Sequence, residues 1–370
     1  MAAKVLATVT EVKISGRHIN NLTTMVGREL ADMIDQQTAA YQQRPLPSQP
    51  TQPKEPITLA TVACDGGRIQ TRAVTSAPGV QDAHWRETKN AGFFRMESHT
   101  YASDPHPDLP RCFANREHLS QLFDSVPQGG PTNASDGQVN IQETEAWQPT
   151  MVSRTCLSSL CDSHAFGPMM AAEADACGFF TAQRRAFLGD GQSYNWTIQE
   201  QYFPDFEPII DFVHPLEYLH QASRAIHLDE EPAWQTFQQW ATWTWQGRVQ
   251  DVLTAIDQAL AQLPTTEEER YQTLVTTRTY LKNNQSRMDY PRYRQAGLPV
   301  SSAMIESLIK EINQRVKGTE KFWNDNHEGE AILYVRAAML CHDDRLTKHL
   351  RNRPGSPYAR ARRSPTSTAA

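Results

Sequence analysis

The sequence lacks any apolar run approaching the roughly 18 residues that a membrane-spanning helix needs. Its start also lacks the basic stretch and apolar core that mark a secretory signal. We therefore expect neither a membrane-embedded nor a fibrous protein, and we place it in the reducing cytoplasm. What is present is an ordinary globular composition: 370 residues, 39% hydrophobic and 21% charged, enough for two or three domains.

Cysteine is scarce, with six residues in the chain, and a reducing compartment keeps such thiols free. Cys156 and Cys161 lie near His164 and Cys177 in the sequence, which offers zinc as an alternative. Their C-x4-C-x2-H spacing is not one of the paired patterns typical of structural zinc. Buried thiols are the favoured interpretation.

The N-terminal part divides into a helix and a linker. Residues 17–40 carry apolar side chains at spacings of three and four, which predicts an amphipathic helix. Five prolines between Arg44 and Pro56 then favour extended, exposed chain. We assign residues 1–40 to a helical segment and 41–56 to a Pro-rich linker, so that the main domain begins at 57.

Short apolar runs follow, and two of them end on an acid. Residues 57–64, ITLATVAC, predict a strand buried on both faces that ends on Asp65. Gly66 and Gly67 predict a tight hairpin turn into a returning strand at 68–74. A third strand is expected at 91–96.

The pattern then alternates between helix and strand, after a long loop predicted at 125–150. A helix around 169–176 precedes a strand at 185–189 that ends on Asp190. A helix to Tyr202 leads to a further strand at 208–213, which contains Asp211 and ends at His214.

From residue 216 to about 281 every periodic signal is helical. This block holds four of the eight tryptophans: Trp234, Trp240, Trp243 and Trp245. They are interpreted mainly as helix–helix core, with stacking on unpaired bases as the alternative. Two more helices are predicted, at 301–317 with Glu306 near its start, and at 328–341.

Asp65, Asp190 and Glu306 would meet if strand ends and a neighbouring helix converge, as in an RNase H-like sheet. Carboxylates that converge repel one another unless divalent metal neutralises them. Two Mg²⁺ ions roughly 3.5–4 Å apart would then suit phosphoryl transfer on DNA.

Each of the three acids also has a local interpretation that needs no metal. Asp65 fits a hairpin and Asp190 a turn or helix cap, while Glu306 fits an i,i+4 surface pair with Lys310.

Five stretches, in order over residues 57–345, resemble the transposases of the ISKra4 insertion-sequence family. They are ACDGGRIQTRA (63–73), HWRETKNAGFFRM (84–96), FLGDGQSYNW (187–196), IIDFVHPLEYL (209–219) and NNQSRMDYPRYRQAGLPVSSAMIESLIKEINQRVKGTEKFW (283–323). The resemblance implies a DDE transposase of the Mutator-like group, which cuts and transfers the DNA strands of a mobile element. Asp65, Asp190 and Glu306 would be its catalytic, metal-binding acids.

The resemblance also implies an α/β fold, with an RNase H-like mixed sheet flanked by helices and an all-α insertion. On this basis the core covers residues 57–215 and 286–344, and the insertion covers 216–285. Mg²⁺, replaceable by Mn²⁺, would be the cofactor. Terminal inverted repeats and target DNA would be the partners of a homo-oligomer on the bacterial nucleoid.

Further residues keep two interpretations. Asp211 and His214 match a D-x2-H signature of the family, so that Asp211 is a candidate metal ligand and His214 a candidate proton shuttle. A histidine that ends a buried strand can equally be a hydrogen-bonded core residue. Lys310, Arg315 and Lys317 are candidate DNA contacts, or else solvated surface cations.

The two ends of the chain qualify this prediction. Residues 4–30 resemble the end of a DNA-recognising helical region, with little upstream of it, so a truncated or domesticated, catalytically inactive DNA-binding derivative is the alternative. A metal-dependent phosphatase or nuclease acting on small phosphoesters is a third hypothesis.

The net charge of −6 divides into +7 for residues 345–370 and −13 for the rest. This asymmetry predicts a disordered basic tail that binds DNA or is only solvated.

Overall fold

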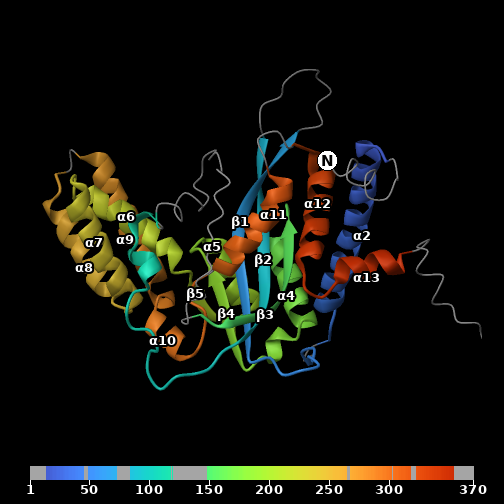
Figure 1. Cartoon of the computed structure of the whole chain (residues 1–370), viewed down its shortest axis with the longest axis horizontal. Coiled ribbons are helices and arrows are strands. Elements are labelled where there is room, and N and C mark those ends of the chain that lie inside the picture. Colours follow the sequence, from blue (N-terminus) through green and yellow to red (C-terminus); the bar gives the residue numbers. More distant parts are fainter. Residues whose placement is uncertain are drawn as a thin grey trace, which may run out of the picture.

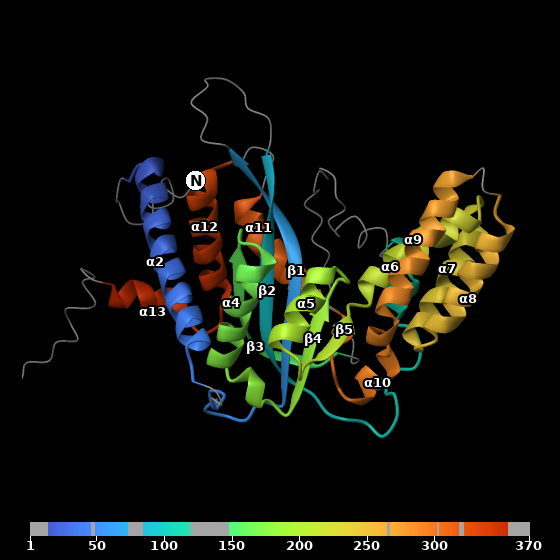
Figure 2. The same ribbon diagram turned by 180° about the vertical axis from the view of Figure 1, so that it is seen from behind.

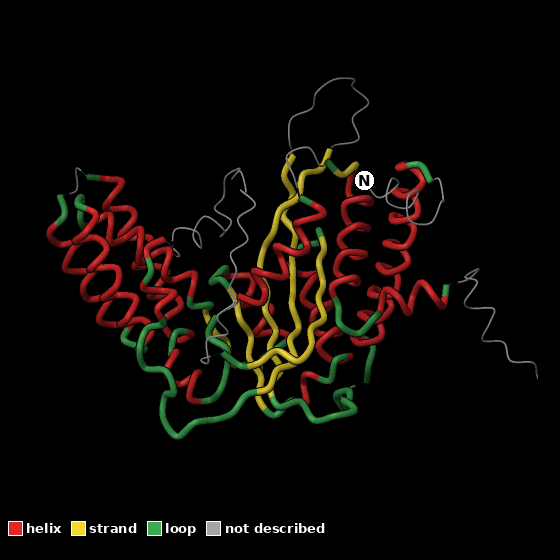
Figure 3. The backbone as a smooth tube through the Cα atoms, in the orientation of Figure 1, coloured by secondary structure: helices red, strands yellow, loops and turns green. Residues whose placement is uncertain are grey.

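The structure, a computed structural model, describes residues 14–45, 49–72, 84–117, 119, 148–264, 267–301, 303–317 and 322–353. A mixed sheet lies at its centre (Figures 1 and 3). Its strands lie in the order β3-β2-β1-β4-β5. They are β1 (Leu59–Arg72), β2 (His84–Glu97), β3 (Thr150–Ser159), β4 (Arg184–Gly189) and β5 (Glu207–Ile210).

The sheet combines both strand directions. β1 and β3 each pair with β2 in antiparallel fashion, whereas β4 runs parallel to β1 and β5 runs parallel to β4. A two-residue strand, β6 (Trp323–Asn324), pairs with the far end of β1. The mixed α/β architecture expected from the sequence is therefore confirmed.

Helices cover both faces of the sheet (Figures 1 and 2). α11 (Ala303–Val316) and α12 (Asp325–Leu340) lie on one face, and α4 (Ser163–Ala176) and α5 (Ser193–Tyr202) lie on the other. α2 (Gly16–Gln42) packs against α12 and α4. A Cβ at Gly27 would lie 2.3 Å from the Ala331 carbonyl oxygen, so this position requires glycine. Short 3-10 turns are η1 (Arg111–Ala114), η2 (Phe179–Thr181) and η3 (Gln285–Arg287).

The predicted all-helical block is a group of four helices beyond β5. They are α6 (Val213–Ile226), α7 (Glu230–Trp245), α8 (Val249–Gln262) and α9 (Glu268–Asn284), and α10 (Tyr290–Gln295) leads back to the sheet. Trp240 and Trp245 are buried, which confirms their interpretation as core. Trp234 and Trp243 are half-buried, with the guanidinium groups of Arg116 and Arg248 over their rings.

The predicted hairpin turn at Gly66 and Gly67 is wrong. β1 is 14 residues long and continues through both glycines to Arg72. Gly66 and Gly67 pair with Lys89 and Thr88 of β2. A Cβ at Gly67 would lie 2.5 Å from the Thr88 hydroxyl oxygen, so glycine serves close strand approach there and not chain reversal. The chain from β1 to β2 lies outside the described residues.

Other boundaries also differ from prediction. The strand expected at 208–213 ends at Ile210, which leaves Asp211 beyond it and His214 in the first turn of α6. β3 was not predicted, because its polar residues gave no apolar pattern. The tail predicted as disordered begins with a helix, α13 (Arg345–Asn352), while residues 354–370 and most of the predicted loop at 125–150 lie outside the described residues. No described helix is long and apolar enough to cross a bilayer.

Candidate active site

Three acids occupy corresponding positions in β1 and directly after the parallel strands β4 and β5. The register pairs Cys64 of β1 with Gly189 of β4, and Gly189 with Ile210 of β5. The next residue in each strand direction is Asp65, Asp190 and Asp211, respectively. The sheet therefore places these three acids in one row, although they are 125 and 21 residues apart in sequence.

Asp65 lies within β1 and not at its end as predicted, because β1 continues past it. Its cross-strand partner is Asn90, and the Gly66 backbone NH donates to its Oδ1 at 2.6 Å. Strand alternation puts Asp65 on the same face as Gly92, where the Ile305 side chain of α11 approaches to 3.1 Å from a Cβ position. Asp65 thus lies on the sheet face that α11 covers.

Asp190 occupies a tight turn between β4 and α5. Its Oδ1 accepts from the Gln192 backbone NH at 2.9 Å and from Asn195 Nδ2 at 2.8 Å. Gly191 has φ +99°, a conformation that favours glycine. The interpretation of Asp190 as a turn residue is therefore confirmed, while its second oxygen has no protein partner among the described residues.

Tyr280 of α9 holds this turn from the other side. Its hydroxyl donates to the Asp190 carbonyl oxygen at 3.1 Å, and its ring would lie 2.7 Å from a Cβ at Gly191. Burial raises the pKa of Tyr280, so its hydroxyl keeps its proton and remains a donor. The insertion therefore reaches the predicted site through this side chain.

The charges around Asp65 and Asp190 are mainly negative. Burial, followed by the charges of both carboxylates, raises the pKa of the Cys64 thiol. Burial also raises the pKa of Tyr194, with Cys64 and the same two carboxylates adding to the shift. The cation beside them is Lys89, whose Nζ lies 2.6 Å from a carboxylate oxygen of Glu87 and 3.9 Å from the centre of the Tyr194 ring.

The third predicted acid, Glu306, lies in the first turn of α11, directly after Ile305. Its backbone is therefore on the sheet face that carries Asp65, but its side chain lies outside the part that the structure describes. Among the described side chains, no group of three His, Cys, Asp or Glu residues is placed to hold a metal ion. Two of the three predicted acids are brought together, and the third is placed by its backbone alone.

Asp211 is buried and lies next to the partly buried His214. Asp211 exposes 0% of its surface, and its Oδ2 lies 3.6 Å from His214 Nε2. Its Oδ1 accepts from the Val213 backbone NH at 3.3 Å. This geometry favours the interpretation as hydrogen-bonded core, and their metal-binding and proton-shuttle roles stay predictions.

The predicted DNA contacts lie along α11. Lys310 is exposed, whereas Lys317 is half-buried at the helix end, with its Nζ 5.7 Å from the centre of the Trp85 ring. The Arg315 side chain lies outside the described part.

Sequence reasoning missed Lys89, Tyr194, Asn195 and Tyr280. Asn195 follows Asp190 by five residues and belongs to the same recognised stretch, which offered a signal for it. Tyr280 is 90 residues from Asp190, and nothing in its own neighbourhood marks it.

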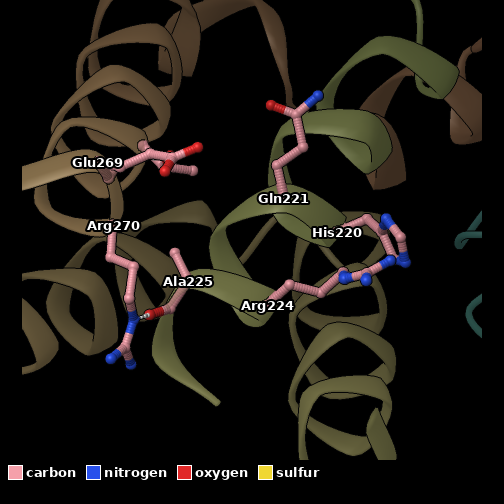
Figure 4. A pocket seen from close by; sticks show the side chains of 7 residues that line it. His220, Gln221, Arg224, Ala225, Glu269 and Arg270 are labelled. Atoms are coloured by element: carbon pink, nitrogen blue, oxygen red, sulfur yellow. Dashed lines mark hydrogen bonds between the residues drawn. The ribbon is translucent and has the colours of Figure 1, made fainter. Parts of the chain in front are cut away.

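A pocket opens elsewhere, between α6 and α9 of the insertion (Figure 4). His220, Arg224 and Arg270 line it, and Arg270 donates to the Ala225 and Ile226 carbonyls at the end of α6. Burial and the Arg224 charge lower the pKa of His220. None of the three acids in the row lines this pocket, and we assign it no part in the site.

Comparison of the chain with known protein families gives no matching family. Comparison with curated proteins gives no match either. Any function must therefore be inferred from the residues and their geometry.

Proposed function

We propose that the chain is a DDE transposase resembling the ISKra4 family, with an RNase H-like core that cleaves and transfers DNA strands. The observation that carries the proposal is the parallel register of β1 and β4, which puts Asp65 of β1 beside Asp190, the residue directly after β4. The strand order β3-β2-β1-β4-β5 and the helical block after β5 support an RNase H-like core with an insertion.

The donor chemistry of the site fits Mg²⁺ or Mn²⁺. Asp65, Asp190 and Glu87 all add negative charge around Cys64 and Tyr194, where Lys89 is paired with Glu87, and a bound cation would neutralise that charge. Carboxylate oxygens are the ligands that such hard cations prefer. Asp65 and Asp190 would hold the metal, with Glu306 as the third ligand.

Bound metal would activate the attacking water or 3′-hydroxyl and stabilise the leaving oxygen. The chain's own residues position the acids for this. The Gly66 NH orients Asp65, while Asn195 and the Gln192 NH orient Asp190 through one oxygen and leave the other for metal. Such outer hydrogen bonds fix the geometry of carboxylate ligands.

The test measures Mn²⁺-dependent nicking and joining of DNA by the purified chain. Asp190→Asn should lower the rate by about 10³-fold or more, since several kcal/mol of charge stabilisation are lost. Asp205→Asn, which changes an exposed aspartate paired only loosely with Arg185 at 3.8 Å, is the matched control.

Equal rates for the wild type and Asp190→Asn would contradict the proposal. DNA binding without any cleavage would favour the inactive derivative. Turnover of a small phosphodiester without preference for DNA would favour the third hypothesis.

A further inference from the structure

Beyond the acid row, β1 and β2 continue as a two-stranded arm. β4 pairs with β1 only as far as Cys64, and β3 pairs with β2 only from Lys89 onward. Among the described strands, residues 66–72 and 84–88 therefore extend past both neighbours, and the two-residue β6 pairs with the end of β1 (Figure 1). This arm exposes surface next to the proposed site.

One face of the arm carries Arg68 and Trp85. Arg68 pairs with Glu87 and Gln70 pairs with Trp85 in the antiparallel register, so all four side chains leave the same face. The Glu87 carboxylate binds Lys89 at 2.6 Å, and no ion pair joins it to Arg68 in the described part of the chain. Arg68 is exposed and has no acidic partner among the described residues.

Lys317 adds a second cation to this face. It lies at the end of α11, and its Nζ is 5.7 Å from the centre of the half-buried Trp85 ring. Burial, followed by the charge of Arg68, lowers the pKa of Lys317. Two cations that repel each other, one of them beside an indole ring, create a place where an anion with an aromatic group is stabilised.

From these contacts we infer that Arg68, Lys317 and Trp85 form a binding surface for a DNA strand, whose phosphates contact the two cations and whose unpaired base stacks on Trp85. At about 3.3 Å per residue, Arg68 lies roughly 10 Å along β1 from Asp65. Strand alternation puts Arg68 and Trp85 on the face opposite to Asp65, so a strand with its reacting phosphate at the acids crosses the edge of β1 that β4 leaves unpaired beyond Cys64 to reach them. The inference rests on the proposed function for the orientation of the DNA strand. It adds where the DNA next to the reacting phosphate lies.

The test uses the full chain carrying Asp190→Asn, without divalent metal, and measures anisotropy of a labelled strand of roughly 20 nucleotides and of its duplex. Arg68→Gln and Lys317→Gln should each weaken binding and reduce the slope of log affinity against log salt by about 0.7–0.9 per lost phosphate contact. Trp85→Ala should weaken single-strand binding by about 5- to 100-fold, with a smaller effect on the duplex, while Trp85→Phe should retain most of it.

Arg278→Gln is the matched control, because it removes one exposed positive charge from the insertion. The inference is overturned if the arm variants match this control, or if Trp85→Ala weakens single strand and duplex equally. Circular dichroism establishes that each variant is folded.

The outcome is separable from that of the proposed function. Binding through this surface by a chain that cleaves no DNA would contradict the proposed enzymatic activity but not the inference about the binding surface. Cleavage by a chain whose binding ignores all three substitutions would contradict the inference alone.

Discussion

The sheet and the helical insertion share one apolar core, but they differ in where their charges lie. At the sheet, charge gathers where the parallel strands end. At the joint with the insertion, a cation is buried beside aromatic contacts: Arg294 of α10 has no exposed surface on its side chain and donates to Asp104 at 2.9 Å and to the Trp245 carbonyl at 3.0 Å, while the Phe212 and Trp245 rings lie 4.9 Å apart. The sheet therefore positions the acids, whereas the contact between Arg294 and Asp104 at this joint fixes the insertion beside them.

The largest effect is expected at this joint. Asp104→Asn leaves the Arg294 guanidinium buried without its counter-charge, which should lower the free energy of unfolding by about 3–5 kcal/mol. Denaturant titration measures this. Asp257→Asn breaks an exposed pair with Arg278 and should cost less than about 1 kcal/mol. Equal losses for the two variants would show that the joint is no more critical than the surface.

The joint should also be sensitive to acid. Burial would raise the pKa of Asp104, but hydrogen bonds from Arg294 and from the His106 NH outweigh it and lower the pKa below 3.8. A depressed folded-state pKa stabilises the protein above the unfolded value, and this stability is lost as pH falls through the folded one. The stability of Asp104→Asn should therefore fall less steeply below about pH 4 than that of the wild type, as denaturation at several pH values would reveal.

A smaller effect is expected where the insertion touches the acid row. Tyr280→Phe removes the donor to the Asp190 carbonyl while keeping the ring against Gly191. It should cost about 1 kcal/mol of stability and raise the Mn²⁺ concentration for half-maximal cleavage by about 10-fold. The stacked neighbour offers a control, since Tyr218→Phe keeps its ring 4.0 Å from that of Tyr280. A Tyr280→Phe enzyme with unchanged metal dependence would limit Tyr280 to a structural role.

The smallest effect is expected next to the sheet, where His349 of α13 and the following Arg353 bind Glu29 of α2. Hydrogen bonds from Arg353 and His349 lower the pKa of Glu29, against the effect of burial. Glu29→Gln should cost about 0.5–1 kcal/mol at neutral pH, and the difference from wild type should vanish as pH falls below about 4.5 through the folded pKa. A difference that persists in acid would exclude the carboxylate charge as its source.

Hydrophobic periodicity and short apolar runs in the sequence predicted much of the fold correctly. The helix at 17–40, the strand at 185–189 and the helical block from 216 lie close to where the structure has α2, β4 and α6–α9. The glycine pair after Asp65 misled because sequence alone cannot separate a turn from a close strand contact. That distinction depends on Thr88, which β2 brings alongside from outside the local segment.

The candidate site was predictable only in part. Asp65 and Asp190 stand in motifs, but their adjacency comes from the parallel register of β1 and β4. Tyr280 lies outside every motif, and Lys89, although it belongs to the stretch 84–96, acquires its role from Tyr194 on another element. Contacts between distant segments are fixed by packing, which local pattern does not encode.

The length of β1 has a consequence for the order of events in the cell. β1 is synthesised early, yet it pairs with β4 at residues 184–189 and with β6 at residues 323–324. At about 5–20 residues per second, roughly ten seconds or more separate its emergence from that of its last partner. A chain still on the ribosome therefore lacks this last strand partner, and under the proposed function it also lacks Glu306 until most of the sequence has been made.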